Sequence, residues 1–211
     1  CVGPDITYVK VQAPNAKRPL IVAQSCLDQL PDWGDYSVLE TFLGQDLQGR
    51  PYEPLFDYFA DWRAKGAFVI LTDDFVNTDE GTGLVHCAPG FGEDDYRVTT
   101  AANIEGLVCP IDAKGCLTDA VVDYQGLYIK DADKAILKDL KARGCVLMQT
   151  VIEHSYPFCP RSDTPLIYRA MPSWFIQVTA LKERLIECNQ SIHWVPAAIG
   201  SGRFGHWLEQ A

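Results

Sequence analysis

The feature of this sequence that most constrains its fold is a series of short apolar runs separated by turn-forming residues. Runs of four to eight residues rich in β-branched side chains are typical of strands. Between the first two runs, the sequence APNA (residues 13–16) is typical of a turn. The predicted strands cover residues 6–11, 19–23, 67–71, 84–87 and 146–152.

Helical periodicity is confined to a few segments. Residues 131–143 place apolar side chains on one face, and Gly144 follows as a stop signal. Residues 179–188 show a similar pattern, and a third helix is expected to begin near Asp94. Many short strands with few helices predict an α+β fold, with a β-barrel-like core and peripheral helices. The end of the chain differs in character, which predicts one domain over 1–170 and a separate segment over 171–211.

Composition limits the kinds of protein that this chain can be. Its net charge is -10, whereas an isolated nucleic-acid binder is usually basic, because neutralised phosphates supply most of its affinity. Eight irregularly spaced cysteines without a Cys-x-x-Cys pair indicate reduced, mostly buried thiols in a cytosolic protein. No apolar run approaches the roughly 20 residues that span a bilayer. We therefore expect a soluble, cytoplasmic protein without a membrane partner.

One segment combines residue types that favour close approach of a ligand to the main chain. Residues 81–96, GTGLVHCAPGFGEDDY, run from a glycine-bracketed threonine through an apolar strand to a histidine. A Pro/Gly loop and three acidic residues at a helix start follow. From the spacing alone, a tight turn with an acidic helix cap is the favoured explanation of this pattern.

The same segment resembles the editing-site signature of the isoleucyl-, valyl- and leucyl-tRNA synthetases, and its histidine with the following APGFGE is the isoleucyl form. Three further segments resemble this family in the expected order. They are HSYPFCPRSDTPLIY (154–168), PSWF (172–175) and GRFGHWLE (202–209). The resemblance therefore spans the chain, and it implies a hydrolytic editing domain followed by a return segment toward the synthetic Rossmann domain.

The resemblance also implies roles for two residues. Asp95 matches the family's carboxylate that holds the ammonium group of the misattached amino acid and so positions the ester for water. Glu93 and Asp94 are expected to cap the helix instead. His86 matches the wall of the amino-acid pocket, where it would admit valine and exclude isoleucine. A general base and a merely structural histidine are the alternatives for His86.

Other candidate site residues carry weaker expectations. Thr82 and Gly83 are candidates for substrate contacts, although a simple turn explains them almost as well. His154 and Tyr156 are candidates for the pocket, with a packed strand end as an equal alternative. Basic residues that are candidates for tRNA phosphate contacts, with solvated surface as the alternative, are Arg161, Arg169 and Lys182.

Neither a metal nor a cofactor is expected in this domain. Where some relatives carry Cys-x-x-Cys, residues 159–162 read CPRS, and a lone thiol cannot build a tetrahedral zinc site. This variation resembles the eukaryotic cytosolic branch of the family. The ATP-binding signatures of the synthetic domain, which uses ATP and Mg²⁺, are missing, so we expect no activation of isoleucine. The family's threonine-rich part of the pocket would precede Cys1.

We therefore expect an editing domain of an isoleucine–tRNA ligase that hydrolyses valyl-tRNA(Ile). Its expected partners are the valine-charged 3′ end of that tRNA and the rest of the synthetase polypeptide. A valyl-type domain clearing threonyl-tRNA(Val) and a non-hydrolytic module positioning the tRNA end are the alternatives. A cysteine hydrolase fits poorly, because neighbours such as His86 and Cys87 on a strand point to opposite faces.

Overall fold

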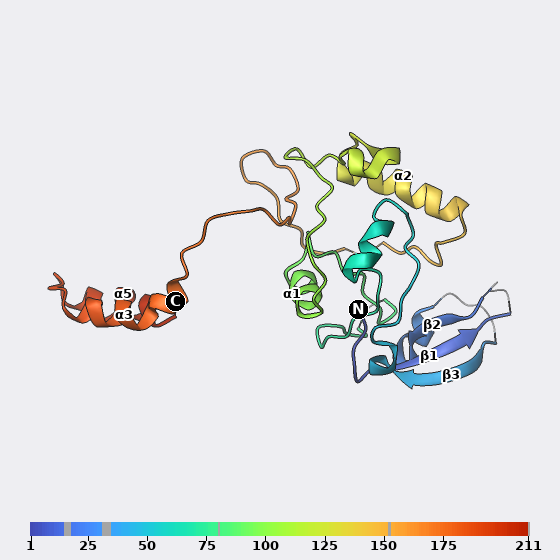
Figure 1. Cartoon of the computed structure of the whole chain (residues 1–211), viewed down its shortest axis with the longest axis horizontal. Helices are drawn as coiled ribbons and strands as arrows, with labels where there is room; N and C mark the ends of the chain where they lie inside the picture. Colours follow the sequence, from blue (N-terminus) through green and yellow to red (C-terminus); the bar gives the residue numbers. More distant parts are fainter. Residues whose placement is uncertain (15–17, 31–34, 80, 152, 211) are drawn as a thin grey trace. The chain divides into compact units, whose positions relative to one another are not determined.

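A computed structural model describes residues 1–14, 18–30, 35–79, 81–151 and 153–210. The chain divides into two compact units, Cys1–Ala170 and Met171–Ala211. Each unit has its own secondary structure (Figure 1). The first contains the sheet, helices α1 and α2, and the candidate site, whereas the second is helical.

The first unit is built on a three-stranded antiparallel sheet of β1 (Thr7–Gln12), β2 (Leu20–Ala23) and β3 (Ser37–Leu43). The strand order is β2-β1-β3, so the central strand is β1. Val9 pairs with Val22 on one side and with Thr41 on the other. Central position and burial go together, since β1 supplies Tyr8, Val9 and Val11 to the main apolar core.

Two of the five predicted strands are confirmed, and their partner β3 was not predicted. The sheet is not closed, so the predicted barrel-like core is not confirmed. The predicted mixed α+β class is confirmed. Residues 67–71 and 84–87 were wrongly predicted as strands, because only Val69 and Leu84 form isolated bridges there. Phe68 has a φ of 63°, which is incompatible with extended backbone. Residues 146–151 form no strand either, and Ile152 lies outside the described residues, as do Asn15 and Ala16 of the predicted turn.

All three predicted helices are present. Helix α1 covers Glu93–Ala101, α2 covers Ile129–Ala142, and α3 covers Val178–Gln190. The α2 backbone leaves the helix at Gly144, whose φ of 67° favours glycine. Short 3-10 helices complete the described elements of the first unit; they are η1 (Gln24–Gln29), η2 (Gly44–Leu47), η3 (Ala60–Lys65) and η4 (Asp119–Tyr124).

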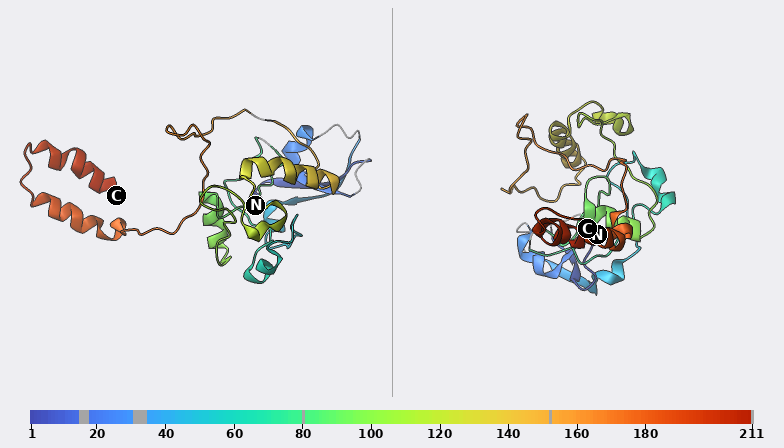
Figure 2. Two further views of the ribbon diagram at one scale, coloured as in Figure 1. Left: turned by 90° about the horizontal axis from the view of Figure 1, so that it is seen from above. Right: turned by 90° about the vertical axis from the view of Figure 1, so that its left-hand side faces the viewer.

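The second unit consists of α3, α4 (Ala198–Ser201) and α5 (Arg203–Gln210). Helices α3 and α5 lie side by side (Figure 2). Asn189 joins the connection between them, since its side chain accepts a hydrogen bond from Trp194 at 2.8 Å and donates one to the Gly200 carbonyl at 2.9 Å. These contacts give the short unit a small packed centre of its own.

The cysteines differ in part from expectation. All eight are free thiols, but only Cys26 is buried, whereas Cys145 and Cys188 are exposed and the others are half-buried. Apolar neighbours in sequence do not ensure burial, because much of this chain lies in loops near the surface. Among the described residues, no helix combines the length and the apolar character needed to cross a membrane.

Candidate functional site

The glycine-bracketed threonine is fixed to the sheet. The Ala23 amide donates to the Thr82 carbonyl at 2.9 Å, and the buried Tyr8 hydroxyl donates to the Gly83 carbonyl at 2.6 Å. Gly83 has a φ of 72°, and a Cβ there would lie 2.5 Å from the Cβ of Ala23. Only glycine fits this position without strain. Thr82 and Gly83 thus have a structural role that holds the start of the loop.

The loop that follows borders an apolar cavity of about 290 Å³ in the first unit. This volume is near the lower end of the range for small-molecule sites, about 300–1,000 Å³. Residues 86–89 and Phe91 form one wall, and Thr99 of α1 contributes to another. The cavity therefore lies between the motif loop and α1. Its aromatic wall is formed by Tyr52, Phe59, Trp62 and Phe68.

His86 and Cys87 both line this cavity. The inference that these neighbours face opposite ways rested on a strand that the structure does not form, so the period-two alternation does not apply. His86 is exposed, which places its ring at the solvent-facing edge. Burial raises the pKa of the Cys87 thiol, and the Asp95 carboxylate raises it further. The thiolate is the nucleophilic form, so this shift disfavours nucleophilic catalysis by Cys87.

Asp95 lies in the first turn of α1 but does not line the cavity. Its carboxylate folds back toward the N-cap residue, since a Cβ on Gly92 would clash with the Asp95 Oδ2 atom. Asp95 is half-buried, and its carboxylate raises the pKa of the Cys87 thiol. Cys87 is part of the cavity wall. The carboxylate therefore interacts with a residue of the cavity wall without lining the cavity itself.

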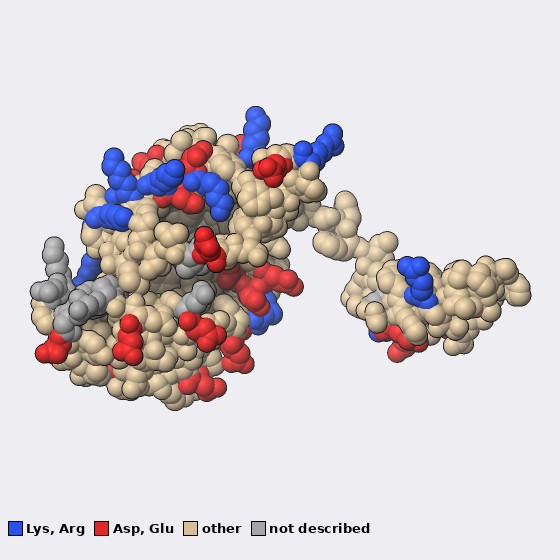
Figure 3. All heavy atoms as spheres, turned by 180° about the vertical axis from the view of Figure 1, so that it is seen from behind, with Lys and Arg blue, Asp and Glu red and all other residues tan. Residues whose placement is uncertain are grey.

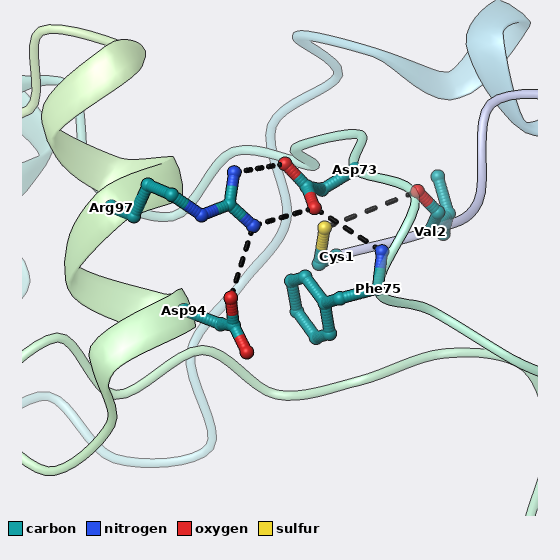
Figure 4. Close-up of polar contacts among 6 residues, drawn as sticks. All are labelled: Cys1, Val2, Asp73, Phe75, Asp94 and Arg97. Atoms are coloured by element: carbon teal, nitrogen blue, oxygen red, sulfur yellow. Dashed lines mark hydrogen bonds and ion pairs between the residues drawn. The ribbon is translucent and has the colours of Figure 1, made fainter. Parts of the chain in front are cut away.

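Helix α1 is held in place by an ion-pair cluster (Figure 4). The Arg97 guanidinium binds both carboxylate oxygens of Asp73 at 2.8 Å and one oxygen of Asp94 at 3.1 Å. The hydrogen bonds from Arg97 lower the pKa of Asp73 below its ordinary value. The Phe75 amide also donates to Asp73 at 3.2 Å. This cluster joins the first turns of α1 to the 73–75 loop. Asp94 therefore has a structural role as a partner of Arg97.

His154 and Tyr156 do not line the cavity that His86 lines. The His154 and Tyr156 rings meet edge to face at 5.9 Å, and Tyr156 meets Phe158 in the same way at 6.0 Å. The Tyr156 hydroxyl donates to the Leu166 carbonyl at 2.7 Å, across a hairpin in which Phe158 pairs with Pro165. Both candidates are exposed and belong to an aromatic row on the surface.

The three basic candidates lie in different surroundings. Arg161 is exposed at the hairpin turn. Arg169 is half-buried and donates from Nη1 to the Asp112 carbonyl at 2.6 Å. The next residue, Ala170, donates its amide to the carbonyl of the buried Gly90, beside the cavity loop, at 2.8 Å. Lys182 is half-buried on α3 in the second unit. Within the first unit, the structure thus brings Arg169 near the motif loop and leaves Arg161 at the hairpin turn.

The aromatic wall of the cavity was not predicted from the sequence. Tyr52 and Phe68 meet edge to face at 6.1 Å, and the Tyr52 amide donates to the Phe68 carbonyl at 2.9 Å. The unusual φ of Phe68 belongs to this wall. No local pattern signals it, because the wall joins side chains before, within and after η3. Among the described residues, no group of three or more His, Cys, Asp or Glu side chains could hold a metal ion.

Comparison with known proteins identifies the family. Residues 8–211 match the family model of tRNA synthetases class I (I, L, M and V). The chain belongs to this family. It is 51% identical to the isoleucine–tRNA ligase of Bdellovibrio bacteriovorus over 212 residues, and 47% identical to that of Chlamydia caviae over 211 residues. It is also 45% identical to the cytoplasmic isoleucine–tRNA ligase of Mus musculus over 216 residues.

These matches cover the whole chain but only part of each relative. All of this chain aligns in each case. The aligned part is 20% of the Bdellovibrio bacteriovorus protein, 20% of the Chlamydia caviae protein and 17% of the Mus musculus protein. The chain thus spans about a fifth of the length of these curated relatives. Because bacterial and eukaryotic members match at similar identity, they do not single out the eukaryotic cytosolic branch.

A solved structure supports the fold. The crystal structure of GlLeuRS-CP1 superposes with a TM-score of 0.51 at 15% identity, covering 72% of this chain and 77% of that one. At this identity the likeness concerns the fold alone. It relates the mixed helix-and-sheet architecture of this chain to that of GlLeuRS-CP1.

Proposed function

We propose that this chain is the editing domain of a cytoplasmic isoleucine–tRNA ligase and hydrolyses the ester of valyl-tRNA(Ile). The observation that carries the proposal is the placement of His86 on an apolar cavity whose wall residue Cys87 has its pKa raised in part by the carboxylate of Asp95. Similarity to isoleucine–tRNA ligases over the whole chain supports the choice of amino acid.

The chemistry follows from the substrate. An aminoacyl ester on the terminal ribose carries an α-ammonium group, and the carboxylate of Asp95 is a suitable anchor for it. Fixing the ammonium group positions the ester carbonyl for attack by water. In this proposal the Asp95 side chain turns from Gly92 toward the substrate when the ester binds. His86, at the open edge of the cavity, limits the size of the amino-acid side chain.

Such a site has a clear energetic purpose. A single methylene group is worth only about 1–3 kcal/mol in an apolar pocket, a general value for which the isoleucyl enzymes are themselves the standard example. Synthesis alone therefore cannot reject valine with high accuracy. A second site that hydrolyses the smaller product supplies the remaining discrimination. We propose that this chemistry needs only water, Asp95 and the tRNA, without a metal or cofactor in the domain.

Two alternatives of different kinds compete with this function. A non-hydrolytic module would position the tRNA end without cleaving the ester, and the Asp95 carboxylate folded against Gly92 is the observation that favours it. A valyl-type domain clearing threonyl-tRNA(Val) is disfavoured by the similarity to isoleucine–tRNA ligases.

The test compares deacylation of valyl-tRNA(Ile) by the chain and by its Asp95→Ala variant. We expect the substitution to slow ester loss by about 100-fold or more, because misplacing a reacting group has effects of this size. Asp94→Ala is the matched control, since Asp94 lies one residue away and binds Arg97. It should retain most of the activity.

Two results would contradict the proposal. Equal deacylation rates in the parent and in Asp95→Ala would remove the anchoring role. Absence of deacylation by the parent, with retained binding of valyl-tRNA(Ile), would favour the positioning module instead.

A further inference from the structure

Helix α2 carries a row of lysines on its outer surface. At about 100° per residue, Lys130, Lys134, Lys138 and Lys141 fall within an arc of about 80°. All four are exposed, whereas the opposite face of α2 packs inward through the buried Ala132. We call these four residues the α2 lysine stripe. Figure 3 shows Lys and Arg side chains gathered over this part of the first unit.

The stripe differs from its surroundings in charge. The whole chain has a net charge of -10, so a row of four cations on one face is a local exception. Helix α2 also carries acids, but Asp139 lies about 140° from the centre of the stripe. The Asp139 carboxylate accepts a hydrogen bond from the Tyr124 hydroxyl at 2.5 Å. Asp131 and Asp133 lie beside the stripe, not within it.

The lysines are largely available for a partner. Among the described residues, Lys134 and Lys138 form neither an ion pair nor a side-chain hydrogen bond. Lys141 donates to the side chain of Gln149 at 2.6 Å, and the Lys130 ammonium lies 5.0 Å from the centre of the Tyr156 ring. Unpaired lysines at regular spacing match a partner with regularly spaced anions.

An aromatic row begins where the stripe ends. Tyr156 contacts Lys130 and continues through edge-to-face contacts to His154 and Phe158. Tyr156 is 38% and Phe158 52% exposed, so ring surface remains open to solvent. Cations beside exposed aromatic rings are the combination that binds the phosphates and bases of single-stranded nucleic acid. An acidic protein would use the lysines but would not need the rings.

The surface leads toward the candidate site. Tyr156 is hydrogen-bonded to Leu166, and four residues later Ala170 is bonded to Gly90 of the motif loop. Four residues span at most about 14 Å. A single strand of nucleic acid that lies on the stripe and the aromatic row could therefore continue to the loop that carries His86.

We propose that the α2 lysine stripe and the Tyr156–Phe158 row bind the sugar–phosphate backbone and unpaired bases of the tRNA acceptor end. This inference rests on the proposed function for the identity of the nucleic acid. Its residues are other than those that line the cavity and other than the basic candidates Arg161, Arg169 and Lys182.

The test measures binding of an uncharged tRNA(Ile) transcript to the full 211-residue chain as a function of salt. Each phosphate contact contributes about 0.7–0.9 to the slope of log affinity against log salt. Lys134→Gln with Lys138→Gln should therefore reduce the magnitude of the slope by about 1.4–1.8. The affinity at about 0.1 M salt should fall roughly 25- to 60-fold.

Matched variants separate specific contacts from general charge. Lys134→Arg with Lys138→Arg should bind as the parent does, because the charges are kept. Arg18→Gln with Arg50→Gln removes two exposed charges from other segments and should leave the slope unchanged. Tyr156→Leu should weaken binding roughly fivefold or more, whereas Tyr156→Phe keeps the ring and should bind normally.

Two outcomes would overturn the proposal. One is an unchanged slope for the glutamine pair on α2, and the other is an equal loss for the Arg18 and Arg50 pair. Because uncharged tRNA is the probe, its binding can be measured without any ester hydrolysis. Loss of deacylation with intact lysine-dependent binding would count against the editing function alone, whereas lysine-independent binding with normal deacylation would count against the stripe alone.

Discussion

Individual residues that are neighbours in the motif have different tasks. Gly83 and Thr82 hold the loop to the sheet through their carbonyls, and His86 reaches the cavity a few residues later. Asp94 binds Arg97, whereas Asp95 folds toward Gly92 and Cys87. The sequence motif is thus a compact mixture of structural and candidate functional residues.

The size of the His86 side chain leads to a prediction for this single residue. If its ring limits the space for the amino-acid side chain, His86→Ala should allow cleavage of isoleucyl-tRNA(Ile), which the parent spares. A difference of one methylene group corresponds to about 1–3 kcal/mol, so we expect the preference for valyl-tRNA to fall by roughly 10–200-fold. Parallel deacylation assays with both esters measure it. Unchanged selectivity in the variant would rule out His86 as the wall.

Among the elements, the position of α1 depends on a contact outside the motif. Arg97 joins this helix to Asp73, whose side chain is 19% exposed and lies on a loop that no periodicity singles out. Because Asp95 is on the same helix, the ion pair helps to position the candidate anchor. The candidate site is therefore supported from the 73–75 loop as well as from the motif.

The pH dependence of this contact can be tested. The pKa of Asp73 is lower in the folded protein than its ordinary value of 3.8. The ion pair therefore stabilises the fold above about pH 4, and its contribution is lost as the pH falls through the lowered pKa. Arg97→Gln should lower the urea midpoint at about pH 7, and the difference from the parent should shrink below about pH 4.

The control for this experiment is Arg50→Gln, which removes an exposed arginine without an ion pair among the described residues. A midpoint difference between the parent and Arg97→Gln that stayed constant from about pH 7 to about pH 3 would show that the Asp73 carboxylate is not its source. Exposure limits the size of the effect, because solvent screens such pairs.

For the chain as a whole, the division into Cys1–Ala170 and Met171–Ala211 has a practical consequence. The first unit contains the sheet, the cavity and the α2 lysine stripe, and its main core draws only on its own residues. The second unit has separate contacts around Asn189 and Trp194. Each unit therefore has the internal contacts expected of an independently stable piece.

We expect residues 1–170 produced alone to unfold cooperatively with a urea midpoint close to that of the corresponding transition in the full chain. The physical reason is that removal of 171–211 leaves the core of the first unit intact. Circular dichroism and tryptophan fluorescence during denaturation would follow this transition. A shortened chain that lacks a cooperative transition would show that the second unit is required for folding of the first.

Local sequence patterns were sufficient to predict the three helices and the first two strands, since these depend on periodicity within short segments. The family was indicated by the resemblance of several motifs along the chain. The motif also indicated His86 as a candidate site residue. Packing of distant segments determined that 84–87 is not a strand, that β3 pairs with β1, and that aromatic residues from 52 to 68 form the cavity wall. Local patterns do not encode such contacts, because the free energy of burial that selects them depends on the packed chain as a whole.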